Sequence, residues 1–468
     1  MNDPVTLSRR RFLAGTGLAA LGLALPGGLL AGCGNDSSSS GGNATLKFWM
    51  DIAGDANQKY FNEHVVQAFE SANSKVKLDV TYYSGADLRR VIQTALQAKS
   101  GPDIVRGLSA SQDLAWTRSG LLKDLGPYAP KGGWDSQIAA WSMTPFTVDG
   151  KVYALPMRED TMMLYYNKTL FDDKNWKPPT NKDEFEALAT EAAGQGLIPI
   201  GATNSTYGAS SEWLVTMFWN HFAGPEAIYQ ALTGKIRWTD PVFGDAINLL
   251  VSYFKKGWVA GSTAKYYSVP LPTIAGQFGQ GKVAMYPSGE WFMPQLNQYF
   301  GKAAKNDNEW DWAPLPSLSS NVPYGLFEVG VGGSYGINAA SKNPKQVAAF
   351  LQWYYGNKET AIQRMAGVPA TYNIPIPIDK SSLPSSMDPR EARLLTSVQE
   401  ALTSGKFGYV TWTWWGPKSD TFIYQGVDKV INGSMSVKDY CAQLDSTFQS
   451  ELKAGNVPTT VEPKPQKV

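Results

Sequence analysis

The chain has 468 residues, of which 43% are hydrophobic and 18% are charged, and its formal net charge is +1. This composition is typical of a globular protein, and the length predicts two or three domains. The balanced charge argues against a nucleic-acid partner, which would favour a basic face. With two Cys, two His and no Walker, Gly-x-Gly-x-x-Gly, His-Glu-x-x-His or Cys-x-x-Cys pattern, the sequence predicts no metal and no cofactor.

The N-terminal segment has the pattern of an export signal. Arg9, Arg10 and Arg11 precede an uncharged apolar stretch that ends in Leu30-Ala31-Gly32-Cys33. A basic start, an apolar middle and small residues before a cut site predict a signal peptide. The arginines before Phe12-Leu13 look like a twin-arginine signal, and the Leu-Ala-Gly-Cys ending resembles a lipobox. We therefore expect residues 1–32 to be removed and Cys33 to carry a lipid that tethers the protein to the extracytoplasmic face of the cell membrane.

A transmembrane anchor is the alternative reading of this segment. The apolar stretch from Leu13 to Leu30 is near the lower length limit for spanning a bilayer. It contains several Gly and a Pro, and its small residues stop directly at a Cys, which favours cleavage and lipidation. Loss of residues 1–32 removes three Arg and one Asp and leaves a formal net charge of −1.

The first part of the remaining chain alternates strands and helices. Residues 33–43 are polar and rich in Gly and Ser, which predicts a flexible linker. Such alternation of elements indicates an α/β sheet that binds ligands at the carboxyl ends of its strands. Hydrophobic periodicity predicts strands at 45–50, 76–82 and 103–105, and helices at 58–72 and 87–98.

The second part is richer in helices. It ends in a tail, 457–468, that we expect to fray. Cys441 falls in a helical pattern and is expected to be a buried structural thiol. The patterns predict an extended segment at 151–166, a strand at 197–200, a strand that breaks into a helix at 285–291, a Gly-rich strand at 330–338, and helices at 182–193, across most of 211–300, and at 345–355, 358–366, 390–403, 419–431 and 437–453.

Aromatic residues are the unusual component of the composition. They make up 12% of the chain and include 16 Trp. Many such rings simply fill a core. A Trp ring also offers a flat apolar face and one N–H, which suits a ring-shaped polar ligand such as a sugar.

Several segments, in their order along the chain, resemble the extracellular solute-binding proteins of bacterial ABC importers, in particular the sugar-binding group related to maltose-binding protein. The resemblance extends over nearly the whole chain after Cys33, although each segment is only moderately specific. The segments are Lys47-Phe48-Trp49, Gly101-Pro102-Asp103-Ile104-Val105, Ser119–Leu125, Asp149–Pro156 with Leu164–Lys168, Gly281–Tyr286 with Gly289-Glu290-Trp291, and Gly336–Asn343 with Ala349-Phe350-Leu351.

The resemblance implies a two-lobed, type II periplasmic-binding-protein-like α/β fold whose lobes close over a ligand. The first lobe would comprise residues 44–156 and 313–370, and the second 157–312 and 371–456. The chain would cross between them at Leu155–Thr161 and Trp312–Pro316. It also implies a monomeric, non-enzymatic receptor that delivers a small carbohydrate to ABC permease subunits in the membrane.

Residues near the first crossing are the first candidates for the ligand site. By resemblance, the Gly-x-Trp pattern places Trp291 in the cleft at the end of a strand. Arg158, Glu159 and Asp160 put three charges into an apolar segment, which is costly if they are buried unpaired. Either they pair with each other or they face the cleft, and the resemblance favours the cleft.

A second set of candidates comes from other parts of the chain. Three Trp within four residues are poorly explained by core packing alone, so we expect at least one of Trp412, Trp414 and Trp415 in the cleft. If that segment is extended, Trp412 and Trp414 share a face. The remaining candidates are Asp51, Ser109 and Gln112 after strands of the first lobe, Glu328 and Tyr335 beside the Gly-rich strand, and, as weaker candidates from the second lobe, Asn204, Tyr207 and Trp213.

Three other functions remain open from the sequence. A glycoside hydrolase would need two opposed carboxylates, for which Asp160 with Glu290 or Glu328 can be imagined. A receptor of the same fold for polyamine, iron or a phosphate ester is a second possibility, although the Trp content favours carbohydrate. A purely structural surface lipoprotein is the third.

Overall fold

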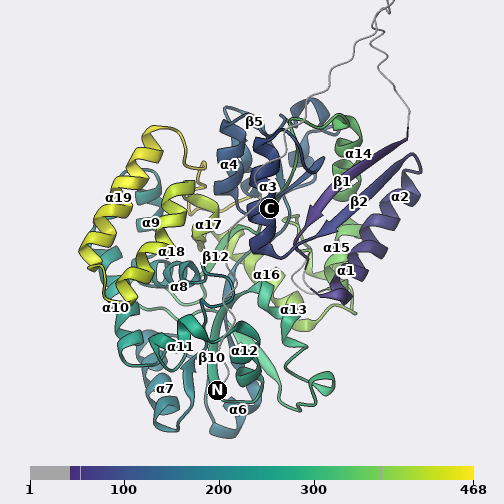
Figure 1. The fold of residues 1–468 in the computed structure, drawn as a ribbon. Helices are drawn as coiled ribbons and strands as arrows, with labels where there is room; N and C mark the ends of the chain where they lie inside the picture. Colours follow the sequence, from purple (N-terminus) through teal and green to yellow (C-terminus); the bar gives the residue numbers. More distant parts are fainter. Residues whose placement is uncertain (1–42, 53, 369–371, 468) are drawn as a thin grey trace, which may run out of the picture. The chain divides into compact units, whose positions relative to one another are not determined.

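The computed structural model describes residues 43–52, 54–368 and 372–467 (Figure 1). The predictions of a signal peptide and of a lipid on Cys33 lie outside the described residues, as does nearly all of the linker. Within the described residues, no helix combines the length and the apolar character that crossing a membrane requires.

The first lobe is built on a five-stranded sheet of order β2-β1-β3-β13-β6. β1 pairs in parallel with β2 and β3, whereas β13 runs antiparallel to β3 and β6. Leu46, Phe48 and Met50 alternate inward along β1 and form a core with Phe61 and other apolar side chains. The elements of this lobe are β1 (Ala44–Met50), α1 (Asp55–Phe61), η1 (Asn62–Gln67), α2 (Ala68–Ala72), β2 (Val76–Tyr82), α3 (Gly85–Gln97), β3 (Ile104–Gly107), α4 (Ala110–Arg118), η2 (Gly126–Tyr128), η3 (Trp134–Ser136), α5 (Ala140–Met143), η4 (Thr144–Phe146), β4 (Thr147–Val148), β5 (Lys151–Val152), β6 (Ala154–Pro156), β13 (Ser334–Ile337), α14 (Pro344–Tyr355) and α15 (Lys358–Gly367).

The second lobe is built on a four-stranded sheet of order β11-β8-β10-β9. β8 lies between two antiparallel neighbours, and every residue of β10 is buried. The elements of this lobe are β8 (Met162–Asn167), α6 (Lys168–Lys174), α7 (Lys182–Gly194), β9 (Ile198–Ile200), α8 (Ser211–Phe218), η5 (Trp219–Ala223), α9 (Pro225–Leu232), α10 (Pro241–Lys255), α11 (Thr263–Ser268), α12 (Leu271–Gly279), β10 (Val283–Gly289), η6 (Glu290–Phe292), α13 (Met293–Leu296), η7 (Lys302–Ala304), β11 (Trp310–Ala313), α17 (Thr411–Trp414), α18 (Pro417–Ile431) and α19 (Val437–Lys453).

A third, three-stranded sheet of order β14-β12-β7 connects the lobes. The chain passes from β6 of the first sheet through β7 to β8 of the second, and returns through β12 to β13. β7 and β12 pair with each other, Asp160 opposite Gly330, so the two crossings form one antiparallel ribbon. The elements of this region are β7 (Glu159–Asp160), β12 (Phe327–Val331), η8 (Lys380–Ser382), α16 (Pro389–Ser404) and β14 (Phe407–Tyr409).

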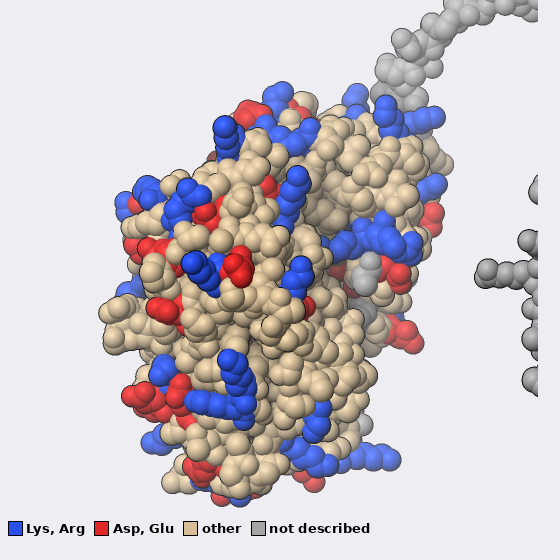
Figure 2. Space-filling view, turned by 60° about the vertical axis from the view of Figure 1, so that its left-hand side comes forward, with Lys and Arg blue, Asp and Glu red and all other residues tan. Residues whose placement is uncertain are grey.

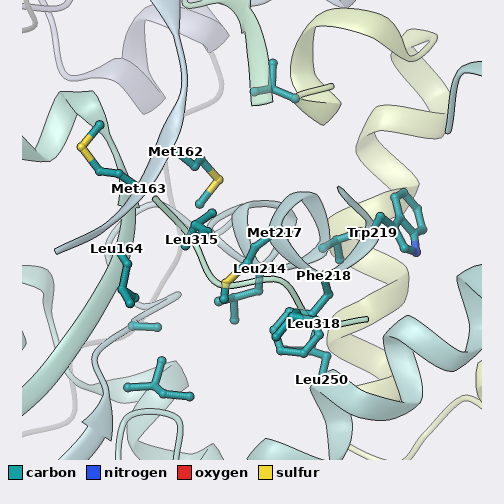
Figure 3. Packing of buried hydrophobic residues seen from close by; sticks show 14 of the residues in the cluster. Met162, Met163, Leu164, Leu214, Met217, Phe218, Trp219, Leu250, Leu315 and Leu318 are labelled. Atoms are coloured by element: carbon teal, nitrogen blue, oxygen red, sulfur yellow. The ribbon is translucent and has the colours of Figure 1, made fainter. Parts of the chain in front are cut away.

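The position of the second crossing differs from the sequence prediction of Trp312–Pro316. Trp312 and Ala313 are still strand residues, paired with Tyr165 and Leu164 of β8. Leu315 and Leu318 then pack in the core of the second lobe, and Figure 3 shows them beside Leu214, Met217 and Phe218. The segment from 313 to about 331 therefore contributes to the second sheet, its core and the connecting sheet before the chain enters β13.

Most predicted elements are present with bounds correct to within three residues, with four exceptions. The Gly-rich strand expected at 330–338 is two strands in different sheets, β12 ending at Val331 and β13 beginning at Ser334. Residues 110–118 form helix α4, where a loop was expected. The Trp-rich segment is a single helical turn, α17, and not an extended strand. The C-terminal tail, expected to fray, is held by hydrogen bonds from the Tyr409 hydroxyl to the Val461 carbonyl and from the Gln466 N–H to the Leu402 carbonyl.

Candidate functional site

The first crossing strand brings Arg158 and Asp160 together on one side of the chain. Their side chains point the same way because strand residues alternate with a period of two. The Arg158 Nε atom lies 2.8 Å from Asp160 Oδ1 and 3.3 Å from Glu290 Oε1. Asp160 and Glu290 are 3% and 1% exposed. The three charges that the sequence placed here are thus partly paired, with a carboxyl from the end of β10 as the further partner.

Burial controls the protonation of this cluster. It raises the pKa of Glu290 well above its ordinary value, and the neighbouring Asp160 charge raises it further, while Arg158 opposes the rise. Burial tends to lower the pKa of Arg158, but the two carboxyls outweigh it and the pKa is raised. Glu290 also accepts the Thr161 N–H at 2.9 Å. The Arg158 guanidinium and a Glu290 carboxyl that holds its proton offer donors to a polar ligand, and the carboxyl oxygens offer acceptors.

Four aromatic rings lead away from this cluster, and we call them the aromatic row: Trp412, Trp291, Trp213 and Tyr207. Trp412 donates its Nε1–H to Asp160 Oδ2 at 2.9 Å. Successive ring centroids are 5.5 Å apart from Trp412 to Trp291, 5.1 Å to Trp213 and 5.7 Å to Tyr207. The row runs from Trp412, which is 7% exposed, to Tyr207, which is 38% exposed. It therefore extends from the buried carboxyls towards solvent.

The first lobe contributes a second arginine. Arg106 of β3 is 2% exposed, and its Nε atom donates to Asp51 Oδ1 at 3.1 Å. The same guanidinium donates to the carbonyls of Gly107 and Gly332. Asp51 follows β1 and Arg106 lies in β3, so both stand near the carboxyl ends of neighbouring parallel strands, where α/β folds bind ligands.

The Gly-rich segment allows these groups to converge. A Cβ atom at Gly332 would overlap the Asp160 carboxylate and the Arg158 guanidinium. One at Gly333 would overlap the Arg106 guanidinium, and Gly333 also has a positive φ of 100°. Only residues without a side chain let both arginines approach the backbone here.

Helix α4 receives Ser109 and Gln112, which were expected in a loop. Ser109 caps the helix by accepting the Gln112 N–H at 3.2 Å. Gln112 Oε1 is buried and has no hydrogen-bond partner among the described residues. Their neighbour Ser111, which sequence reasoning missed, donates its hydroxyl to the Trp415 carbonyl at 2.6 Å. Helix α4 of the first lobe thus contacts α17 directly.

Five predicted site residues lie elsewhere. Glu159 points to the other face of β7 and lines a cavity of about 10 Å³ with Trp141, and burial raises its pKa to about 8. Glu328 is fully buried against His221 Nε2 at 2.9 Å. The others are core aromatics: Tyr335 packs among Phe48, Phe350 and Tyr354, Trp414 donates its Nε1–H to the Val329 carbonyl, and Trp415 stacks on Trp219 and Trp238.

Side chains that sequence reasoning passed over complete the site. Arg106 and Ser111 were not considered, and Glu290 was considered only as a hydrolase carboxylate. Glu290 is a charged residue between Gly289 and Trp291, directly after the apolar strand. That position was the sequence feature that could have indicated it. Of the weaker candidates, Tyr207 joins the aromatic row, whereas Asn204 donates to Asp428 at 3.0 Å. The described residues contain no group of three or more His, Cys, Asp or Glu side chains arranged to hold a metal ion.

Lys and Arg side chains are interspersed with Asp and Glu over the face shown in Figure 2. This agrees with the balanced charge of the sequence. On that face, the charges do not resemble the basic stripe that a nucleic-acid-binding surface presents.

Comparison with known proteins places this chain in a family. The family model for bacterial extracellular solute-binding proteins matches residues 54–361. The multiple sugar-binding protein of Streptococcus mutans is 24% identical over 51% of this chain and 58% of its own length. The galactooligosaccharide-binding protein of Bacillus subtilis is 25% identical over 78% of this chain and 82% of its own length. The chain spans 56–58% of the length of the first curated relatives it matches.

A solved structure supports the same assignment at the level of the fold. A chitin oligosaccharide binding protein superposes with a TM-score of 0.73 at 19% identity, covering 88% of this chain and 99% of its own. The predicted type II periplasmic-binding-protein-like fold is confirmed. Because the family model matches well over half of its residues, the chain belongs to the bacterial extracellular solute-binding protein family.

Proposed function

We propose that this protein captures a carbohydrate on the extracytoplasmic side of the cell membrane and delivers it to the membrane subunits of an ABC importer. One observation carries the proposal: the aromatic row ends on the buried Arg158–Asp160–Glu290 cluster. Aromatic faces cover the apolar faces of sugar rings, and charged and neutral polar groups exchange hydrogen bonds with hydroxyls. The names of the streptococcal and Bacillus relatives support a sugar as ligand.

The arrangement of the row favours an oligosaccharide over a monosaccharide. Trp412 lies at the carboxyl cluster, while Tyr207 lies at the exposed end of the same row. A single sugar ring would use only the Trp412 end. A chain of sugars would use successive rings, with its last units near Tyr207.

The connecting sheet supports ligand entry by lobe movement. Arg89 of α3 in the first lobe donates to the Tyr207 hydroxyl at the exposed end of the row at 3.1 Å, so separation of the lobes would uncover that end. β7 and β12 are short paired segments between two larger sheets, which is the arrangement of a hinge. We propose that rotation about this ribbon opens the site and that closure covers the bound sugar.

The carboxyl geometry supports binding without catalysis. Glycoside hydrolysis needs two carboxyls on opposite sides of the scissile bond. Here Arg158 Nε lies within 3.3 Å of both Asp160 and Glu290, and the Asp160 charge adds to the burial that raises the pKa of Glu290. Two carboxyls held on one arginine suit the recognition of hydroxyl groups. Release of reducing sugar from oligosaccharides would contradict this part of the proposal.

We further propose that Cys33 carries the lipid that retains the protein at the membrane. The supporting observation is the Leu30-Ala31-Gly32-Cys33 ending of the apolar segment. Cys33→Ala should move the protein from the membrane to the soluble fraction of cells and abolish labelling by a fatty-acid analogue. Unchanged fractionation would favour a transmembrane anchor.

A thermal-shift screen of the full-length protein tests the ligand class. The panel contains maltotriose, raffinose, chito-, xylo- and galacto-oligosaccharides, with spermidine, glycerol phosphate and ferric iron as competing classes. A ligand at 100 times its Kd stabilises by about 2.7 kcal/mol, which gives a measurable rise in Tm. A rise with spermidine, phosphate ester or iron alone would retain the fold and discard the carbohydrate.

Matched tryptophan variants then locate the binding site. Trp291→Ala removes a ring of the aromatic row, whereas Trp176→Ala removes a half-buried ring that packs on Phe171 elsewhere in the second lobe. We expect Trp291→Ala to weaken sugar binding at least about tenfold, or ~1.4 kcal/mol, and Trp176→Ala to leave it unchanged. Equal effects of the two substitutions would place the ligand elsewhere.

A further inference from the structure

A single helical turn, α17, carries the ring of the aromatic row that lies at the carboxyl cluster. Its four residues, Thr411–Trp414, are all buried. A segment this short is not stabilised by its own hydrogen bonding, because the first turn of a helix fixes several residues for one bond. The bond that closes it, from the Trp415 N–H to the Thr411 carbonyl, is long at 3.4 Å. Contacts with neighbouring elements therefore set where α17 lies.

Helix α17 is in contact with α4 of the first lobe, α8 of the second lobe and the connecting strand β12 (Figure 1). The Thr413 hydroxyl accepts the Val331 N–H at 3.0 Å and donates to the Val331 carbonyl at 3.4 Å. The Thr411 hydroxyl lies 3.0 Å from that of Thr216 in α8. A Cβ atom at Gly330 would overlap the Thr413 hydroxyl, so the backbone of β12 lies directly against α17. These contacts attach α17 to the connecting sheet and to the second lobe.

The first lobe reaches α17 through the Ser111 hydroxyl. Ser111 lies in the first turn of α4 and is 1% exposed. Its hydroxyl donates to the Trp415 carbonyl at 2.6 Å and lies 3.4 Å from the Trp412 carbonyl. The last carbonyls of a helix have no partner within the helix, so a donor here satisfies groups that the turn itself cannot. Because a hydroxyl has one proton, the shorter contact is the stronger bond.

The Trp412 ring depends on this backbone for both of its contacts in the site. Its Nε1–H reaches Asp160 Oδ2 at 2.9 Å, and the ring lies edge-on to Trp291, with centroids 5.5 Å apart. A Trp side chain has two rotatable bonds, so one backbone position and one rotamer are needed to make both contacts. Groups that bind a ligand are held to within about 0.5 Å by hydrogen bonds from their neighbours. Ser111 supplies a bond of this kind from the first lobe.

We propose that Ser111 is a positioning residue for the ligand site: its hydroxyl fixes the end of α17 from the first lobe and thereby sets the position of the Trp412 ring. Ser111 contacts no ligand in this role and acts through the backbone that it bonds. The role rests on the proposed function, in which Trp412 covers a sugar ring. It gives the first lobe a share in the orientation of an aromatic ring that belongs to the second.

A matched serine distinguishes this role from a structural one. Ser142 is also fully buried in the first lobe, and its hydroxyl donates to the Ala139 carbonyl at 2.7 Å. Ser111→Ala and Ser142→Ala therefore each remove one buried hydroxyl that is bonded to a backbone carbonyl. We expect similar falls in Tm from both, because each leaves a carbonyl with one donor fewer. Only Ser111→Ala should displace the Trp412 ring.

Fluorine nuclear magnetic resonance of the full-length chain, labelled with 5-fluorotryptophan and measured without sugar, reports the position of the ring. Trp412→Phe identifies the Trp412 signal by its absence. We expect Ser111→Ala to shift or broaden this signal and Ser142→Ala to leave it in place. Ser111→Cys keeps a side chain of similar shape with a weaker donor, so it should shift the signal less and in the same direction. It also provides the measurement if Ser111→Ala does not fold.

Sugar binding is then measured by calorimetric titration. The ligands are those of maltotriose, raffinose and the chito-, xylo- and galacto-oligosaccharides that raise the Tm of the parent protein. Loss of one positioning hydrogen bond should raise the Kd about three- to tenfold in Ser111→Ala. The Kd of Ser142→Ala should equal that of the parent.

Three results would overturn the proposal. One is a Trp412 signal that stays in place in Ser111→Ala and Ser111→Cys. Another is an equal displacement of that signal by Ser142→Ala, and the third is an unchanged Kd in a Ser111 variant whose signal has moved. A parent protein that binds none of the sugars would contradict the proposed function. The fluorine signal, measured without sugar, reports the effect of Ser111 on the ring separately.

Discussion

Two clusters of this protein contain the same parts, one arginine and two buried carboxyls near an aromatic ring, but they lie in different regions. Arg158, Asp160 and Glu290 all lie on the first crossing and the adjoining second lobe. In the other cluster, Glu212 and Asp420 belong to the second lobe and Arg89 to the first. In each cluster, burial strongly raises the pKa of one carboxyl.

The difference lies in what can move. Arg158, Asp160 and Glu290 contact one another within the first crossing and the second lobe, so we propose that this cluster is a fixed recognition surface. Arg89 lies on a separate rigid element, so its contacts change with the distance between the lobes. We propose that the first cluster recognises the ligand, whereas Arg89 connects the first lobe with Tyr207 of the second.

The largest expected difference between the two clusters is the change in the free energy of unfolding when the arginine of each is replaced. Arg158→Met leaves Asp160 and Glu290 buried without their cation, and removal of one partner from a buried ion pair costs about 3–5 kcal/mol. Arg89 is only half-buried, so Arg89→Met should cost about 0–1 kcal/mol. Urea unfolding of both variants at pH 7 measures the difference. Similar free energies of unfolding would show that the clusters are equally fixed.

A second comparison concerns the tryptophans of α17. Trp414→Ala empties a fully buried core position and should lower the free energy of unfolding by about 3–5 kcal/mol. Trp412→Phe keeps a ring but removes the Nε1–H that Asp160 accepts, which should cost about 1–3 kcal/mol. We expect Trp412→Phe to weaken sugar binding. We expect the folded Trp414→Ala protein to bind sugar as the parent does. Calorimetric titration of the folded variants provides the measurement, and loss of binding in Trp414→Ala alone would reverse the assignment.

The pH dependence of stability sharpens the comparison further. Burial raises the pKa of Asp113 and of Asp420 to about 7, against about 4 in the unfolded chain. The folded protein therefore binds more protons than the unfolded chain between these values, and the free energy of unfolding falls as the pH rises from about 4 to 7. Each such group contributes at most about 1.4 kcal/mol per pH unit. Urea unfolding at pH 5, 6 and 7 should show this fall.

Single amide variants separate the contributions to that fall. Asp113→Asn removes a carboxyl inside the first lobe, where it accepts from Ser334 and faces Arg106. Asp420→Asn removes a buried carboxyl of the second lobe. Each variant should flatten the pH dependence, whereas Asp307→Asn, at an exposed position with no described ion pair, should not. Stability that rises with pH in the parent over this interval would show that other groups dominate.

The smallest expected effect concerns the Arg89–Tyr207 contact. Tyr207→Phe removes one partly exposed hydrogen bond and should change the free energy of unfolding by about 0.5–1.5 kcal/mol or less. The ring and its stacking on Trp213 remain. Differential scanning calorimetry can detect this change. A large destabilisation would mean that Tyr207 holds the lobes together by itself.

The order of elements could be predicted from the sequence because it depends on neighbours along the chain. Alternation predicts β2 at residues 76–82, and helical spacing predicts α7 and α19 with ends correct to within one residue. The Gly-rich segment correctly indicated a close approach of backbone and side chains, which Gly332 provides for Asp160. The family and its fold follow from the same ordered segments, since each is a local signature.

The composition of the site depended on the tertiary structure. Trp412, Trp414 and Trp415 are equivalent by sequence, yet one helical turn sends the first to Asp160, the second to the Val329 carbonyl and the third onto Trp219. Arg106 and Arg89 carried no local signal, because their partners lie 55 and 118 residues away in the chain. Periodicity reports which face of an element is buried, whereas the side chain across that face is set by packing between distant segments.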